Sequence, residues 1–205
     1  YCTLMLADMG ADVVKIEAFP EGDGSRRFDP KVNGESYCFA VLNRNKKSVG
    51  LNMKDARGKE IFMKLARDAD INMENYRPGV TRKLGIDYES IKAINPDIIY
   101  CSVSGFGQTG PYSQKGGFDI IAQGMSGIMA LTGMPGHPPT KVGGSVADLA
   151  AALWAFGVAN AALAHRLRTG RGQHLDVSLL ASTLALLPDP VAHFFDSGQR
   201  PPRVG

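Results

Sequence analysis

Asp148 is the residue whose surroundings best fit a chemical role. It follows the run Gly143-Gly144-Ser145-Val146-Ala147 and lies in the first turn of a long apolar segment. A helix dipole there would favour the ionised carboxylate, and nearby backbone amides could stabilise an oxyanion, so Asp148 could act as a nucleophile. An Asp chosen only for its charge at a helix N-terminus gives the same pattern, and on the pattern alone this second interpretation is favoured.

Basic side chains gather in the first half of the chain, in or beside expected loops. They could hold a ligand with several phosphates, although ordinary solvated surface explains most of them. The candidates are Arg26, Arg27, Arg44, Lys46, Lys47, Lys54, Arg82 and Lys83. The stretch from Glu74 to Gly79 follows an expected strand with an Asn, an aromatic ring and Pro-Gly, so it could stack an adenine or simply form a tight turn.

Several familiar sites are absent from the sequence. It contains no GxGxxG after a strand, no Walker A loop, no HExxH and no GxSxG. The histidines lack metal-ligand spacing, and we expect no metal. The cysteines lack CxxC spacing and are typical of buried thiols in a reducing compartment; they are Cys2, Cys38 and Cys101.

The composition is that of a globular protein, with 44% hydrophobic residues, 21% charged residues and a net charge of +3. This charge is too small to indicate a nucleic-acid partner. No apolar stretch approaches the roughly 20 residues of a membrane span, so we expect no membrane partner. The chain begins without Met and ends in a Gly/Pro/Arg-rich stretch, 197–205, and we expect a fragment cut at both ends.

The elements that must position these residues alternate between strand and helix. Strands are expected at 11–17, 48–52, 69–74, 97–104 and 175–179, the last of which could instead begin a helix. Helices are expected at 1–9, 55–70, 80–85, 88–94, 118–129 and 146–168. The last helix is apolar on most faces and should be buried on several sides, whereas the polar, Gly- and Pro-rich segment 20–35 should be a loop.

This alternation predicts an α/β fold with a parallel sheet and helices on both faces. Ligands of such sheets bind at the carboxyl ends of the strands. From the residues alone we therefore expect an α/β protein that could bind a phosphorylated cofactor.

In their order along the chain, several segments resemble the class III CoA-transferase family, which includes formyl-CoA transferase, carnitine CoA-transferase and α-methylacyl-CoA racemase. The similar segments cover essentially the whole chain: LADMGADVVKIE (6–17), EGDGSR (21–26), NRNKKSVGLNMK (43–54), ENYRPGVTRKLGIDYE (74–89), NPDIIYCSVSGFGQTGP (95–111), GGFDIIAQGMSGIMALTG (116–133), ADLAAALWA (147–155) and RTGRGQHLDVSLL (168–180).

The resemblance implies a Rossmann-like large domain, a smaller second domain, and two chains interlocked as a homodimer. Residues 1–190 would be the N-terminal part of the large CoA-binding domain without its first strand. Residues 191–205 would begin the connection to the second domain. We expect a cytoplasmic protein, with a mitochondrial location as the alternative.

The resemblance also implies roles for particular residues. Asp148 matches the catalytic Asp, Asp119 would support it near the acyl group or cap a helix, and Gly143 and Gly144 would supply oxyanion donors. Ala18 stands where several members place a phosphate-binding Arg. The positions implied to hold the CoA nucleotide are Leu51, Lys54, Asn75, Tyr76 and Lys83, with Arg82 and Arg26 as helpers.

The implied reaction moves CoA from an acyl-CoA to a carboxylic acid acceptor through a covalent aspartyl intermediate, without ATP or metal. The racemase branch carries a His-Asp pair where this chain has Phe118-Asp119, and racemisation needs two acid/base groups. The transferase is therefore favoured. A racemase or other isomerase of the family, and a CoA-binding homologue without activity, remain the alternatives.

Overall fold

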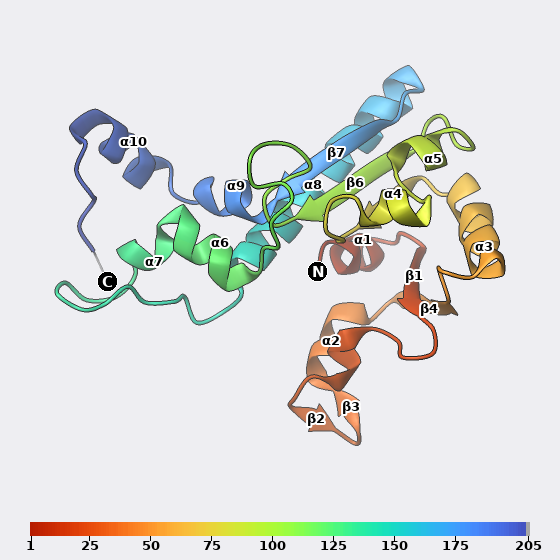
Figure 1. Ribbon diagram of the computed structural model, residues 1–205, viewed down its shortest axis with the longest axis horizontal. Coiled ribbons are helices and arrows are strands. Elements are labelled where there is room, and N and C mark those ends of the chain that lie inside the picture. The colour runs from red at the N-terminus through yellow and green to blue at the C-terminus, as the bar shows by residue number, and fades with distance from the viewer. Residues whose placement is uncertain (204–205) are drawn as a thin grey trace. The chain divides into compact units, whose positions relative to one another are not determined.

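The structure, a computed structural model, describes residues 1–203 and has the expected α/β architecture of parallel strands flanked by helices (Figure 1). The chain divides into two compact units. Unit 1 contains residues 1–70 and 81–98, and unit 2 contains residues 71–80 and the chain from residue 99 onward. The domain boundary expected after residue 190 falls inside a helix and stays a prediction.

Unit 1 is built on a parallel pair of strands, β1 (Val13–Ala18) and β4 (Lys46–Leu51). Parallel neighbours cannot be joined by a tight turn, and a crossover segment connects them here. The other elements of unit 1 are α1 (Cys2–Asp8), η1 (Gly24–Arg27), β2 (Lys31–Val32), β3 (Glu35–Ser36), α2 (Tyr37–Asn43), α3 (Ala56–Arg67), α4 (Val80–Leu84), of which the first residue belongs to unit 2, and α5 (Tyr88–Lys92).

The segment 20–35 was expected to be a loop, and this expectation is wrong in part. It contains η1 and the antiparallel hairpin of β2 and β3. Asn33 and Gly34 join the two strands with φ of 52° and 83°. Positive φ at both central residues is the signature of a type I′ hairpin turn, which Asn-Gly favours. The dipeptide was therefore a readable hairpin signal.

Unit 2 contains a parallel sheet in the order β5 (Ile71–Glu74), β6 (Ile99–Ser104), β7 (Gln173–Ser178). The central strand β6 is almost wholly buried, as expected where helices and neighbouring strands cover it. The helices of unit 2 are α6 (Asp119–Ser126), α7 (Ile128–Leu131), α8 (Val146–Thr169), α9 (Leu179–Leu184) and α10 (Pro188–Ser197). The ambiguous segment 175–179 belongs to β7 except for its last residue, which begins α9.

Helix α8 lies against β6 and β7 (Figure 1). It also contacts α6 and α9. Its buried stripe is formed by alanines, whose small side chains let neighbouring elements approach closely: Ala147, Ala150, Ala151, Ala155, Ala159 and Ala162. The larger side chains Leu149, Leu153 and Trp154 are 42%, 55% and 49% exposed. The expectation that this helix is buried on several sides is therefore wrong for the described residues.

The expectation that no segment is long and apolar enough to span a membrane is also wrong. By length and composition alone α8 is such a helix, with a mean hydropathy of 1.6. The core helix of a soluble protein passes the same test of length and composition, and 33% of the apolar window of α8 is buried.

Gly58, in the first turn of α3, allows the helix to begin beside the preceding turn. A Cβ built on Gly58 would lie 2.1 Å from the backbone oxygen of Asn52. We expect Gly58→Ala to lower the free energy of unfolding by about 1–3 kcal/mol, because backbone must move to relieve the clash. Urea unfolding would measure this loss.

Gly124, in α6, is the matched control, because its added Cβ would meet only the Met129 sulfur at 3.8 Å. Gly124→Ala should be neutral or stabilising by up to about 1 kcal/mol through higher helix propensity. If both variants unfold at the same urea concentration as the wild type, the close approach at Gly58 does not constrain the fold.

Candidate functional site

Asp148 is the third residue of α8, and its helix start is held by a side chain from a different helix. Ser145, at the N-cap position, makes no side-chain cap hydrogen bond. Instead, Asp119 Oδ1 accepts from the backbone N–H of Ala147 at 2.9 Å and from that of Asp148 at 3.4 Å. Asp119, on α6, therefore caps the N-terminus of α8. Its supporting role near the acyl group stays a prediction.

The position of Asp119 depends on a close backbone crossing just before α6. A Cβ built on Gly105, after β6, would lie 2.6 Å from the Gly117 Cα, and one built on Gly117 would lie 2.7 Å from the Gly105 Cα. Only glycine fits at such an approach. The crossing ties the start of α6, and with it the buried Asp119, to the carboxyl end of the central strand.

The carboxylate of Asp148 belongs to an exposed residue, but its surroundings still alter its acidity. Partial loss of hydration, followed by the negative charge of Asp119, raises the pKa of Asp148 above the ordinary value for Asp. The lone pairs of its carboxylate are more basic than those of an ordinary Asp, which suits attack on a carbonyl carbon.

The segment before α8 presents backbone donors that no described protein group occupies. Within residues 1–203, no hydrogen bond engages the amides of Gly143, Gly144, Ser145 and Val146. A Cβ built on Gly143 or Gly144 would meet nothing within 4 Å, and neither has positive φ. Neither backbone conformation nor packing within the described residues therefore requires glycine at these two positions.

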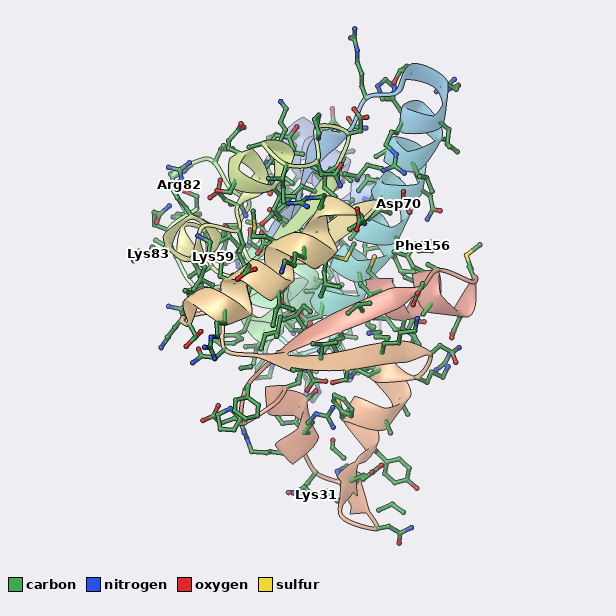
Figure 2. The ribbon with its side chains drawn as sticks, turned by 90° about the vertical axis from the view of Figure 1, so that its right-hand side faces the viewer. Lys31, Lys59, Asp70, Arg82, Lys83 and Phe156 are labelled. Atoms are coloured by element: carbon green, nitrogen blue, oxygen red, sulfur yellow. The ribbon has the colours of Figure 1, made fainter. Side chains whose placement is uncertain are left out.

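Unit 1 carries a second group of candidate residues around an open hollow of about 430 Å³. Its lining is Met53, Lys54, Asp55, Ala56, Lys59, Lys83 and Leu84. Two of the lysines, Lys54 and Lys83, are predicted nucleotide contacts, and the structure brings them together. Figure 2 shows Lys59 on α3, with Lys83 and Arg82 on α4.

The three lysines of the hollow are chemically available. Among the described residues, none of Lys54, Lys59 and Lys83 forms a side-chain hydrogen bond or ion pair. Asp55 lines the same hollow, but its side chain accepts from the Arg57 N–H and begins α3. Three unpaired ammonium groups around one hollow form a favourable site for a phosphorylated ligand.

Lys59 was missed by the sequence analysis. It lies within an amphipathic helix, where a lysine normally belongs to the solvated face. Its ammonium reaches the end of α4, because a Cβ built on Gly85 would lie 2.2 Å from Lys59 Nζ. That contact between α3 and Gly85 is long-range, and the spacing of residues gave no sign of it.

Leu51 and Arg26, also predicted nucleotide contacts, do not line this hollow. Leu51 is buried at the end of β4, and its carbonyl accepts from the Phe19 N–H. The Arg26 guanidinium donates twice to the buried Glu17, at 2.7 and 2.8 Å, and lies over the Phe39 ring. This pairing, first among several contacts, lowers the pKa of Glu17 to about 2.

Asn75 and Tyr76 lie in unit 2, just after β5. Asn75 Nδ2 donates to the Val103 carbonyl at 2.7 Å, which leaves its side-chain oxygen as an acceptor. The Tyr76 N–H donates to Glu74, and its ring is 45% exposed. The stacking of an adenine on this ring stays a prediction.

The sequence matches CoA-transferase family III over residues 1–205. It is 46% identical to acetyl-CoA:oxalate CoA-transferase of Acetobacter aceti, with 99% of this chain and 52% of that protein aligned. It is 43% identical to succinyl-CoA:glutarate CoA-transferase of Mus musculus, with 100% of this chain and 47% of that protein aligned.

Among solved structures, it is similar to a CAIB/BAIF family protein from Brucella suis. The TM-score is 0.96 at 41% identity, covering all of this chain and 55% of that one. The chain spans about half the length of the relatives it matches.

Proposed function

Because the chain belongs to CoA-transferase family III, we propose that the protein moves CoA from an acyl-CoA to a carboxylic acid through a covalent intermediate on Asp148. The observation that carries the proposal is the exposed Asp148 carboxylate beside backbone amides without a described partner. Neither packing nor backbone conformation among the described residues requires glycine at 143 and 144. Glycine is expected at such positions where a substrate must approach the backbone closely.

The bonds that form and break belong only to this carboxylate and the substrates. An Asp148 oxygen attacks the thioester carbonyl, the C–S bond breaks, and CoA leaves as a thiolate, which gives a mixed anhydride. The thiolate then attacks the aspartyl carbonyl, releases the donor acid and forms an aspartyl-CoA thioester. The acceptor carboxylate then takes the same steps in reverse. It attacks the aspartyl-CoA thioester, which releases the CoA thiolate and forms a new mixed anhydride between Asp148 and the acceptor. The thiolate attacks the acceptor's carbonyl in this anhydride, which forms the new acyl-CoA and frees Asp148.

Each addition creates an oxyanion, for which the amides of residues 143–146 are the proposed donors. Relatives of this chain are named for oxalate and glutarate, which are dicarboxylic acids. We therefore place short dicarboxylic acids first among the acceptors. The interlocked homodimer and the cytoplasmic location stay predictions.

A direct test uses the protein expressed at the full length of its gene. Acetyl-CoA or succinyl-CoA is incubated with ¹³C-labelled oxalate, glutarate or a related acid. The CoA thioesters are then separated by chromatography, and their masses are measured by mass spectrometry. A labelled acyl-CoA is the expected result. CoA binding without exchange for any pair, or α-proton exchange with deuterated water alone, would move the assignment to a non-catalytic homologue or an isomerase.

The lysine-lined hollow is the proposed site of the CoA phosphates, and Lys59 gives a prediction there. Lys59→Met should raise the Kd for CoA about 10-fold, because one charged contact to phosphate contributes about 1.5–3 kcal/mol before screening. The effect should shrink as salt is added. Calorimetric titration with CoA at two salt concentrations measures both.

Lys64→Met is the control for this measurement. Lys64 lies on the same helix but does not line the hollow; it is exposed and paired with Glu60 at 2.8 Å. Its Kd for CoA should match the wild-type value. Equal affinities of the Lys59 and Lys64 variants would remove Lys59 from the phosphate site.

A further inference from the structure

The side chain of Gln123 is fully buried and uses both ends of its amide. Nε2 donates to Asp119 Oδ2 at 2.6 Å and to the Gly144 carbonyl at 3.2 Å. Oε1 accepts from the Val142 N–H at 3.0 Å. The orientation of the amide follows from its partners, since the carboxylate and the carbonyl can only accept and the N–H can only donate.

These contacts fix the direction of the backbone that leads into α8. Gln123 holds the Gly144 carbonyl toward itself. The peptide between Gly144 and Ser145 is planar and trans, so the Ser145 N–H points the opposite way. Gln123 thereby sets the direction of one of the unoccupied donors. Two consecutive glycines have wide conformational freedom, and this segment would lose a defined direction without such an anchor.

The Gln123 amide also restrains the Asp119 carboxylate, which accepts from the backbone N–H of Asp148. Asp119 Oδ2 accepts from Gln123, while Oδ1 accepts from the N–H groups of Ala147 and Asp148. One buried side chain thus connects both the donor segment and the capping carboxylate. An apolar side chain of similar volume would fill the space but leave the Val142 N–H without its acceptor. It would also leave the Gly144 carbonyl with only the exposed Lys141 ammonium, which donates to it at 3.3 Å.

We propose that Gln123 is a positioning residue for the transferase reaction, which holds the Gly144–Ser145 peptide and the Asp119 carboxylate in the geometry that the Asp148 intermediate requires. This inference rests on the proposed function of Asp148. Gln123 does not itself touch the reacting atoms; it acts through the backbone of residues 142–144 and through Asp119.

Two variants separate positioning from simple packing. Gln123→Met keeps the volume and removes every polar contact. Gln123→Glu keeps an acceptor for the Val142 N–H but, when ionised, repels Asp119 and cannot donate. When protonated, Glu can donate one hydrogen bond again. The Glu variant should therefore regain activity relative to the wild type as the pH falls, whereas the Met variant should not.

The measurement is kcat and KM for acyl-CoA between pH 5 and 8 on the protein expressed at the full length of its gene. We expect about a 10- to 100-fold lower kcat for both variants at pH 8, with KM nearly unchanged, as for a slight misplacement of reacting groups. Ser126→Ala is the control. Ser126 is buried on the same helix, donates to the Gln123 carbonyl at 3.2 Å, and makes no described hydrogen bond to residues 142–148.

The outcomes are distinguishable. The inference is supported if kcat of the Gln123→Glu variant, divided by kcat of the wild type, rises as the pH falls. It is also supported if the Gln123→Met variant loses activity in kcat and not in KM. If wild type transfers CoA and both variants keep kcat within twofold, or if the Glu ratio is flat with pH, the inference on Gln123 is overturned. If wild-type protein itself transfers no CoA, the proposed function fails first. Should the Met variant not fold, the pH dependence of the Glu variant still decides.

Discussion

Asp148→Asn should abolish CoA transfer, with kcat lowered at least about 10³-fold, because the amide has no anionic oxygen with which to open the thioester. The variant should fold, since the Asp148 side chain is exposed and its backbone N–H still reaches Asp119. CoA binding should persist, because the lysines of the hollow are untouched. Transfer assays and calorimetric titration with CoA measure the two effects separately.

The intermediate itself can be observed at this residue. Wild-type protein incubated with acyl-CoA and borohydride should yield a peptide in which the activated carboxyl of Asp148 is reduced. Asp189→Asn is the matched control, because Asp189 is also an exposed first-turn Asp, on α10. It should retain full transfer and trapping. A modified peptide elsewhere, or transfer by the Asn variant, would remove Asp148 from the mechanism.

The surroundings of Asp148 determine in which direction the pH dependence of borohydride trapping should shift. Loss of hydration and the charge of Asp119 raise its pKa above the ordinary value. The nucleophile is the ionised form, so trapping should decline on acidification from a higher pH than for an unperturbed Asp.

The fold was predictable wherever local pattern and tertiary environment agree. The strand 97–104 and the helices 55–70 and 146–168 correspond to β6, α3 and α8, with boundaries shifted by up to three residues. Helix α2, between β3 and β4, was not predicted. Its start depends on Ser36, whose side chain accepts from the Phe39 N–H, and on a hairpin that was interpreted as loop.

The exposure of α8 shows why apolar composition alone misleads. Ala and Leu occupy most of its faces, but among the described residues of α8 only alanines are buried. Side-chain size, rather than hydrophobicity, separates the face that packs closely from the face that carries Leu153 and Trp154.

The candidate site was predictable in its residue types and much less so in its connections. Asp148 and the lysines at 54 and 83 were proposed from the resemblance. The structure places Lys54 and Lys83 at one hollow, and the roles of all three residues stay predictions. Gln123 and Lys59 were not found. Each acts across a distance in sequence, from α6 to residue 144 and from α3 to Gly85, and periodicity along a helix carries no such information.

Asp119→Ala should lower the free energy of unfolding by about 2–4 kcal/mol, more than the loss of an ordinary helix cap. Three donors lose their acceptor at once: the N–H groups of Ala147 and Asp148, and the Gln123 side chain. Because Gln123 is fully buried, water cannot readily replace the missing oxygen. Urea unfolding, compared with the wild type at the same protein concentration, measures the loss.

Asp87→Ala is the appropriate comparison, because Asp87 is a local N-cap that accepts from Ser90 within its own helix, α5. Its loss should cost about 1 kcal/mol. Asp119→Asn refines the result: an amide oxygen can still accept from α8, but its NH₂ then faces the Gln123 NH₂, so its cost should fall between the two. If Asp119→Ala costs no more than Asp87→Ala, the start of α8 is held by its own turn. The geometry of Asp148 would then depend on neither Asp119 nor Gln123.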